Sequence, residues 1–259
     1  MALVVSFFLL LVSAYQSLAE LSECARGMTM EGYKTTQYGV SEGSPKAMNA
    51  ITACFWMSTP AEYANKYYPT PLSYKVKGAT WGNNFMLDMH PDLVLYVGKI
   101  HTIAVIKCLK ILLISTGVNL ADGKLHHVCI TWKSSSGTFA VYKNGRFEKS
   151  LKIINKDKEI EAGGTWVIGQ DQDPGAGYAF QNKDSFKGNL TEVNIWDRVL
   201  TSYEIKRVAK DCGTLIQGNI KKYSDFKKSK ATKFIERLPC CTTCEYSLNC
   251  LLFLLTSRK

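Results

Sequence analysis

The sequence predicts an all-β fold, a sandwich of two antiparallel sheets, from three observations. Short stretches rich in β-branched and aromatic residues alternate with turn residues from about Gly39 to Phe226. Asn144-Gly145 is a strong hairpin signal, because this pair accepts the positive φ angles of a type I′ turn. A capping box, Thr201 to Glu204, indicates one short helix near the end of the region. Many short strands with one helix are typical of a β-sandwich.

Each expected strand is an apolar or alternating stretch that ends near a turn residue. These stretches cover residues 50–57, 93–97, 127–132, 138–142, 166–168 and 190–196. The helix begins at Thr201, whose hydroxyl can accept from the amide of Glu204 while the Glu204 side chain reaches back. It carries Ile205 and Val208 on one face and ends at Cys212-Gly213.

Two segments lack the turn chemistry of their neighbours. Residues 99–115 form a long apolar stretch, and residues 229–259 are first basic and then rich in cysteine. The tail cysteines resemble part of a metal site, but no second pair or histidine completes four ligands, so disulfide bonds or a disordered tail are expected. Both segments are expected to lie outside the core.

The first 19 residues resemble a secretory signal peptide. An apolar stretch from Leu3 to Ala14 precedes Ser17-Leu18-Ala19, which has small residues where a signal peptidase would cut. A positively charged start is missing, and a buried core segment is the alternative. The mature chain is expected to begin near Glu20 and to be secreted. No later stretch is long and apolar enough for a membrane span.

Composition and charge leave several partner classes open. With 46% hydrophobic residues the chain can form a sizeable core. The net charge of +10 suggests an anionic partner, such as acidic polysaccharide, phospholipid headgroups or nucleic acid, although a solvated basic face would give the same value. Nine cysteines in an oxidising compartment are interpreted first as disulfide partners.

One motif in the middle of the chain is specific to a family. The pattern His-x-Cys-x-Ser/Thr-Trp-x-Ser/Thr is matched at every fixed position by His127, Cys129, Thr131, Trp132 and Ser134. Downstream, the loop at 168–173, the strand at 186–200 and the segment at 218–226 follow in the family's order. From about Tyr33 to Phe226 the chain thus resembles the pentraxins. A pentraxin-like domain is expected at 20–228, with 99–115 as an atypical insertion.

The resemblance implies a jelly roll with one helix packed on one sheet, and a disulfide bond between Cys54 and Cys129. Cys24 and Cys212 flank the domain and could form a second disulfide bond that joins its ends. Pentraxins hold two calcium ions on one face of the sandwich. Calcium prefers carboxylate, amide and carbonyl oxygens, about six to eight of them. Carried over position by position, the ligands implied are Asn83, Asn84, Asp171, Gln172, Asp173, Gln181 and Asp184.

Three of these positions depart from the family. Asn83 stands where aspartate is usual and Gln181 where glutamate is usual, while Asp184 replaces a common glutamine. An amide keeps an oxygen ligand but loses the charge, so weaker calcium binding is expected unless Asp184 compensates. The phenylalanine of the family's phosphocholine pocket falls near Met89, and Tyr96 could fill the space beside it. Phosphocholine specificity is therefore not expected.

The function implied is that of a secreted, calcium-dependent pattern-recognition lectin, and not of an enzyme. Its ligands would be phosphorylated or anionic glycans or lipid headgroups rather than nucleic acid. The resemblance also implies a homo-oligomer, which in this family is usually a pentamer. The alternative is a pentraxin-type adhesion or receptor module of a larger cell-surface protein. A glycan hydrolase would need two facing carboxylates, which are found only in the proposed calcium loop.

Two further motifs contain side chains that could react or be modified. Asp122, His126 and His127 with Cys129 could suggest nucleophilic catalysis. His127 and Cys129 alternate on one strand, however, so a core histidine beside a structural disulfide is expected. Asn189 begins a glycosylation sequon, Asn-Leu-Thr, at the start of an apparent core strand.

Overall fold

The computed structural model describes residues 26–79, 83–90, 92–97, 114–152, 155–172, 179–210 and 216–236. Several predictions fall outside these ranges: the signal peptide at 1–19, most of the insertion at 99–115, the tail beyond 236, and the residues Cys24, Asp173 and Cys212.

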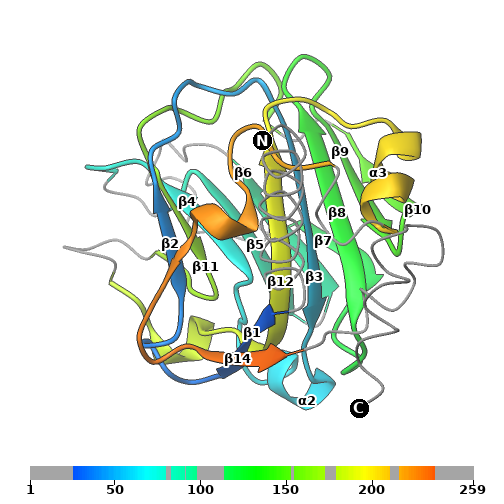
Figure 1. Ribbon diagram of the computed structural model, residues 1–259. Coiled ribbons are helices and arrows are strands. Elements are labelled where there is room, and N and C mark those ends of the chain that lie inside the picture. Colours follow the sequence, from blue (N-terminus) through cyan, green and yellow to red (C-terminus); the bar gives the residue numbers. More distant parts are fainter. Residues whose placement is uncertain are drawn as a thin grey trace, which may run out of the picture.

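The described chain forms two antiparallel sheets of seven strands each, packed face to face (Figure 1). Sheet A has the order β10 (Arg146–Leu151), β9 (Thr138–Lys143), β8 (His126–Lys133), β3 (Ala50–Ser58), β12 (Lys187–Trp196), β1 (Arg26–Glu31) and β14 (Lys233–Glu236). Sheet B has the order β13 (Lys227–Lys228), β2 (Gly39–Glu42), β11 (Thr165–Ile168), β4 (Leu72–Lys75), β5 (Phe85–His90), β6 (Asp92–Val97) and β7 (Ile114–Asn119). The predicted two-sheet sandwich is confirmed.

The core between the sheets follows from the alternation of side chains along each strand. On β5, Phe85, Leu87 and Met89 are fully buried and belong to this core. Trp132 of β8 and Trp166 of β11 are also fully buried in it. Every second residue of β5 therefore faces the opposite side of sheet B, and this fixes which residues are available to a site there.

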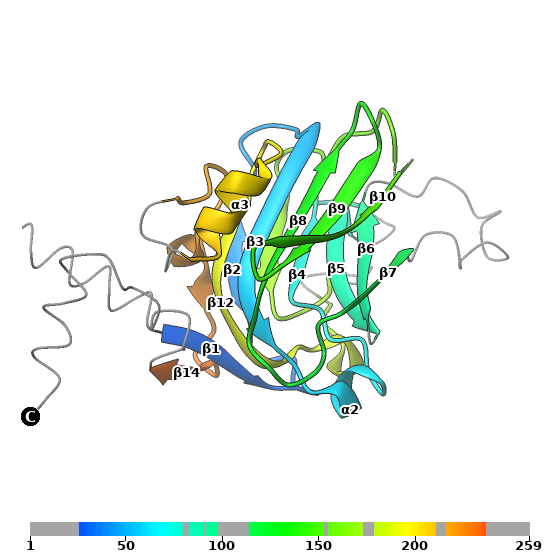
Figure 2. The same cartoon turned by 90° about the vertical axis from the view of Figure 1, so that its right-hand side faces the viewer.

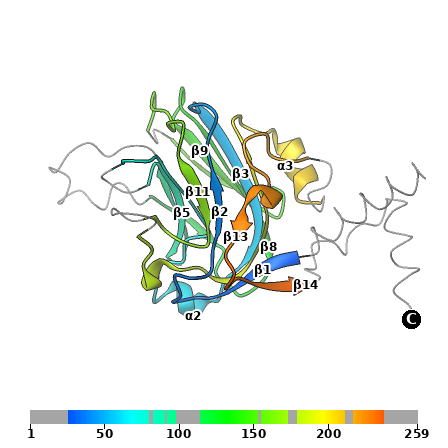
Figure 3. The same ribbon diagram turned by 60° about the vertical axis from the view of Figure 1, so that its left-hand side comes forward.

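A second, smaller apolar layer covers the outer face of sheet A. Helix α3 (Ser202–Val208) packs there through Ile205 and Val208, over Trp196 and the disulfide bond between Cys54 and Cys129. The structure thus contains the disulfide that the resemblance implied. Figure 3 shows α3 and sheet B on opposite sides of the sandwich, so the outer face of sheet B is free of this helix. A further one-turn helix, α2 (Ala61–Ala64), lies at one end of the sandwich (Figure 2).

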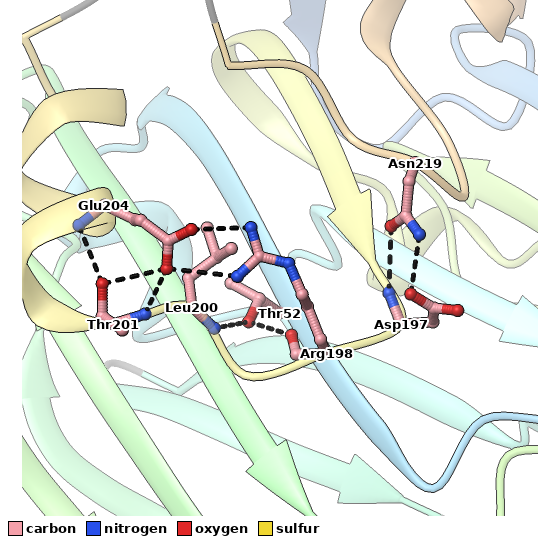
Figure 4. Close-up of polar contacts among 7 residues, drawn as sticks. All are labelled: Thr52, Asp197, Arg198, Leu200, Thr201, Glu204 and Asn219. Atoms are coloured by element: carbon pink, nitrogen blue, oxygen red, sulfur yellow. Dashed lines mark hydrogen bonds and ion pairs between the residues drawn. The ribbon is translucent and has the colours of Figure 1, made fainter.

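The start of α3 is fixed by the predicted capping box and by one ion pair (Figure 4). The Thr201 hydroxyl accepts from the Glu204 amide at 3.2 Å, and the Thr201 amide donates to the Glu204 carboxylate at 2.7 Å. Both guanidinium nitrogens of Arg198 donate to the same carboxylate, at 3.1 and 2.6 Å. Thr52 of β3 links this corner to sheet A, because its hydroxyl accepts from the Leu200 amide.

The basic stretch near the end of the described chain belongs to the sandwich. Strand β13 pairs with β2, and β14 pairs with β1 beyond residue 228, where the domain was expected to end. The Lys233 ammonium also forms an ion pair with Glu31. Within the described ranges, no helix is long and apolar enough to cross a membrane.

Candidate functional site

The candidate site lies on the outer face of sheet B, where the chain that follows β11 crosses β4. The Gln172 amide donates to the Ser73 hydroxyl at 3.2 Å and to the Thr165 carbonyl at 3.0 Å. Ser73 in turn donates to the Gln170 carbonyl at 2.8 Å. These bonds hold residues 170–172 against sheet B and place Asp171 between two anchored neighbours.

Asn83 and Asp171 meet at this point although they lie 88 positions apart in the chain. The Asn83 amide nitrogen donates to an Asp171 carboxylate oxygen, and it also lies 3.4 Å from the sulfur of Met86. Asn83 is buried, with 8% of its surface exposed. Its carbonyl oxygen, Oδ1, is buried and has no hydrogen-bond partner. An unsatisfied buried oxygen costs free energy, so this atom is a candidate ligand for a cation.

Asp184 reaches the same region on the short helix η3 (Asn182–Asp184), which runs beside residues 68–70. The Tyr68 amide donates to the Lys183 carbonyl at 3.0 Å, and the Thr70 amide donates to the Asp184 carbonyl at 3.2 Å. Asp184 is buried, with 6% of its surface exposed. Asp184 is thus anchored through its backbone beside residues 68–70, and its carboxylate, like that of Asp171, lies close enough to act electrostatically on Asp88.

A third carboxylate, Asp88, which was not among the predicted ligands, faces this cluster from β5. It lies on the outward side of the strand, opposite to Leu87 and Met89, and yet it is only 7% exposed. Its Oδ1 accepts from the Met89 amide at 2.9 Å and from the Thr70 hydroxyl at 3.4 Å. Thr70 thus contacts both Asp88 and the backbone of Asp184.

The electrostatic environment of Asp88 reflects this crowding. Burial raises the pKa of Asp88 well above its usual value, and the nearby carboxylates of Asp171 and Asp184 raise that pKa further. The hydrogen bonds from Met89 and Thr70 act in the opposite direction. A divalent cation bound among the three carboxylates would relieve their mutual repulsion.

The other predicted ligands are placed differently. The Asn84 side-chain oxygen accepts from the Val76 amide at 2.8 Å, so this residue also closes the turn between β4 and β5. Gln172 is buried through its bonds to Ser73 and Thr165. Gln181 precedes η3, and its side chain is exposed. Asp173 lies outside the described residues.

The donor set fits a hard cation such as calcium. It combines three carboxylates, Asp88, Asp171 and Asp184, with the orphaned amide oxygen of Asn83. Oxygen donors of this kind, without nitrogen or sulfur ligands, are the set that calcium prefers. Asn83, Asp171 and Asp184 come together as the resemblance implied, while Asn84 and Gln172 use amide groups in structural hydrogen bonds.

The alternation of side chains along β5 could have shown that Asp88 faces the site. It also shows that Met89 does not face the site. Asp88 is an acidic residue within an otherwise apolar strand and falls on the face opposite to Phe85 and Leu87. Met89, the position expected near the phenylalanine of a phosphocholine pocket, is fully buried in the core between the sheets. Asp88 instead of Met89 therefore faces the site.

The histidines near the disulfide form no catalytic group. His127 is 1% exposed, and its Nε2 lies 3.9 Å from the Cys129 sulfur, which is bonded to Cys54. Burial lowers the pKa of His127 to about 3, so the ring is neutral at physiological pH. His126 instead pairs with the Asp122 carboxylate at 2.9 Å. Because the sulfurs of Cys54 and Cys129 are consumed in the disulfide, these residues lack a thiolate for a nucleophile or a metal.

Asn189 lies within sheet A on β12, between β3 and β1. Its amide donates to the Ser58 hydroxyl at 3.1 Å, and its carbonyl oxygen accepts from the Thr29 hydroxyl at 3.0 Å. A glycan attached to this nitrogen would compete with the bond to Ser58. Glycosylation of Asn189 stays a prediction.

The two-layer β-sandwich, with one helix on one face and a cluster of carboxylate and amide oxygens on the other, defines a protein of the jelly-roll class. A model of the Pentaxin family matches residues 34–233. The chain therefore belongs to this family, as the signature around Cys129 predicted.

Relatives of the chain include larger proteins. It is 35% identical over 190 residues to the rat "Sushi, von Willebrand factor type A, EGF and pentraxin domain-containing protein 1", a match that covers 73% of this chain and 5% of the relative. It is 30% identical over 190 residues to human neuronal pentraxin-2, covering 71% of this chain and 38% of the relative. The chain thus spans a small or moderate part of the length of these relatives.

Solved structures show the same fold. A heptameric SAP-like pentraxin from Limulus polyphemus aligns with a TM-score of 0.67 and 24% identity, over 84% of this chain and 97% of that chain. The extracellular region of zebrafish Gpr126/Adgrg6 aligns with a TM-score of 0.58 and 18% identity, over 83% of this chain and 27% of that chain.

Proposed function

We propose that the chain is a secreted recognition module that binds phosphorylated or anionic glycans or lipid headgroups through calcium. The observation that carries the proposal is the buried, unpartnered Oδ1 of Asn83 beside the carboxylate of Asp171. A calcium ion would satisfy this oxygen and relieve the repulsion among the neighbouring carboxylates. The full ligand set proposed comprises Asn83, Asn84, Asp171, Gln172, Asp173, Gln181 and Asp184 for two ions.

Ligand class follows from the chemistry that a bound calcium ion adds. A calcium ion held on an open face keeps coordination positions for oxygen atoms of the ligand, such as those of phosphate or sugar. The net charge of +10 favours anionic ligands in addition. Phosphocholine is not favoured, because the outward residue of β5 is the carboxylate Asp88 and Met89 faces the core.

The proposal includes a compartment, a domain span and an assembly. Secretion is supported by the signal-like residues 1–19 and by the disulfide bond between Cys54 and Cys129. The domain is proposed to span 20–228, and the pairing of β14 with β1 extends the folded part to 236. A homo-oligomer, by resemblance a pentamer, is proposed; light scattering after size exclusion measures it.

A second candidate function is a pentraxin-type module of a larger cell-surface protein. It is favoured by the first relative above, of which the chain matches only 5%, and by the fold shared with the extracellular region of zebrafish Gpr126/Adgrg6. In that case the module would act as a monomer or as part of another assembly. The mass of the secreted native protein distinguishes the two functions.

Ligand binding is tested on glycan and lipid arrays probed with the native protein in millimolar calcium and again in chelator. Spots that carry phosphorylated or acidic groups should bind only in calcium. A variant with Asp171→Asn should lose this signal, whereas Asp157→Asn, an exposed change of equal charge outside the site, should keep it. Binding that persists in chelator would refute the mechanism.

A further inference from the structure

Asp88 occupies a position that folding alone does not favour. It faces outward from β5, next to apolar neighbours, and is 93% buried with no ion pair to any other described residue. Burying a carboxylate without a counter-charge is unfavourable, and an apolar residue would fit the strand without that penalty. A side chain of this kind points to a ligand or to a specific structural role.

The contacts of Asp88 leave one of its oxygens available. Oδ1 accepts both hydrogen bonds, from the Met89 amide and from the Thr70 hydroxyl, whereas Oδ2 has no donor among the described residues. Thr70 also binds the Asp184 backbone, so Asp88 is tied to the segment that carries Asp184. On the other side of the cluster, the orphaned Asn83 oxygen lies beside Asp171.

From this arrangement we propose that Asp88 is a third carboxylate of the calcium site and replaces the negative charge that Asn83 does not carry. The inference rests on the proposed calcium-binding function and adds a residue to it. The affinity of a calcium site depends on the charge of its ligands and on the rigidity of the site. With Asp88 included, the cluster holds three carboxylates on anchored backbone. Asp88 then offsets part of the calcium affinity that is lost through the amide at Asn83.

The competing explanation is structural. Asp88 could be a protonated acid that only accepts the bonds from Met89 and Thr70, with no part in binding the ion. The two roles respond differently to substitution. Asp88→Asn keeps shape and hydrogen-bond acceptance but removes the charge, whereas Asp88→Glu keeps the charge but adds a methylene to a buried position. If Asp88 binds the ion, calcium affinity should be highest in wild type, lower in D88E and lowest in D88N. If its role is only structural, thermal stability should be highest in wild type, lower in D88N and lowest in D88E.

Calorimetric titration of calcium chloride measures the Kd of the wild-type chain, D88N, D88E and the control D92N. The melting temperature of each protein is then measured in chelator and in calcium. Asp92 is a matched control because it lies on the same hairpin and on the same face as Asp88, in register with His90. We expect D88N to raise the calcium Kd about tenfold or more and to reduce the calcium-induced rise in melting temperature. D92N should change the Kd less than about threefold, as a long-range charge effect would.

The results separate the role of Asp88 from the calcium-binding function itself. If wild type, D88N and D92N bind calcium alike, the role of Asp88 in the site is refuted while the calcium function stands. If wild type itself binds no calcium, the proposed function fails first. If D88N does not fold, Asp88→Ser, which removes the carboxylate without adding volume, serves in its place: a folded D88S whose calcium Kd is raised about tenfold supports the proposal, and one that binds calcium as wild type does overturns it.

Discussion

Asn83 donates a hydrogen bond to Asp171 across 88 positions of the chain, and its own carbonyl oxygen is left buried without a partner. The first residue lies ahead of β5 and the second follows β11, so the contact exists only once both strands have joined sheet B on either side of β4. The relationship places an amide where the family usually has a carboxylate, in direct contact with the central carboxylate of the proposed site.

Restoring the usual carboxylate should therefore have two opposite effects. In Asn83→Asp the bond to Asp171 is replaced by repulsion, so the melting temperature in chelator should fall by a few degrees. In calcium the added charge should lower the Kd several-fold and enlarge the calcium-induced rise in melting temperature. Thermal unfolding in chelator and in calcium measures both effects.

A remote variant controls for net charge in that comparison. Asn49→Asp adds the same charge at an exposed position just before β3. Its calcium-dependent shift should equal that of wild type. An Asn83→Asp protein that is stabilised in chelator, or that gains nothing from calcium, would contradict the placement of Asn83 in the site.

The capped start of α3 should contribute measurably to stability. Glu204 accepts from Arg198 and from Thr201, and chiefly the Arg198 contact lowers the pKa of Glu204 to about 2. Glu204→Gln should therefore lower the free energy of unfolding by about 0.5–2 kcal/mol at neutral pH. Because the native pKa lies below the unfolded value, this contribution is present above about pH 4.5 and is lost as the pH falls toward 2.

Urea unfolding of wild type and Glu204→Gln from pH 7 to pH 2 measures this effect. The two curves of stability against pH should converge at the acidic end. Arg198→Ala should lose a similar amount, since it removes the other half of the same ion pair. Equal stability of all three proteins at pH 7 would contradict the role assigned to the pair.

His127 should make the fold sensitive to mild acid. Burial lowers its native pKa to about 3, while the unfolded chain takes up the proton near the ordinary value of 6.5. Between these values the unfolded state binds more protons, so stability should fall as the pH decreases from 6.5 toward 3, by several kcal/mol in total. Replacement by the uncharged His127→Gln should flatten this part of the curve.

The control for His127 is His90, whose side chain is exposed and stacks on Tyr68 at 4.6 Å between ring centroids. His90→Gln should keep the slope of wild type between pH 6.5 and pH 3. A wild-type stability that does not change across this range would contradict the neutral, buried state of His127.

Local patterns of the sequence were enough to predict most of the fold. The Asn144-Gly145 turn, the Thr201–Glu204 capping box and the apolar strands each depend on neighbouring residues, and the structure contains all three. Helix α2 was not predicted, because four residues are too few to show the periodicity of a helix. The pairing of β14 with β1 in sheet A was not predicted either, because the basic residues around Lys233 are typical of a solvated tail.

The site was predictable only in part, because its members come from three separate regions of the chain. The resemblance supplied Asn83, Asp171 and Asp184, and the structure brings these together. Asp88 was missed since no family pattern marks it; only the side of β5 on which it falls shows its relation to the site. Hydrogen bonds that use the amides of Asn84 and Gln172 depend on tertiary contacts and could not be read from spacing.

Calorimetric titration of calcium chloride into the chelator-treated wild-type chain tests the central claim most directly. We expect saturable binding at or below millimolar calcium, and loss of that binding in Asp171→Asn with the fold intact by circular dichroism. An absence of saturable binding at millimolar calcium in a folded wild-type protein would contradict it.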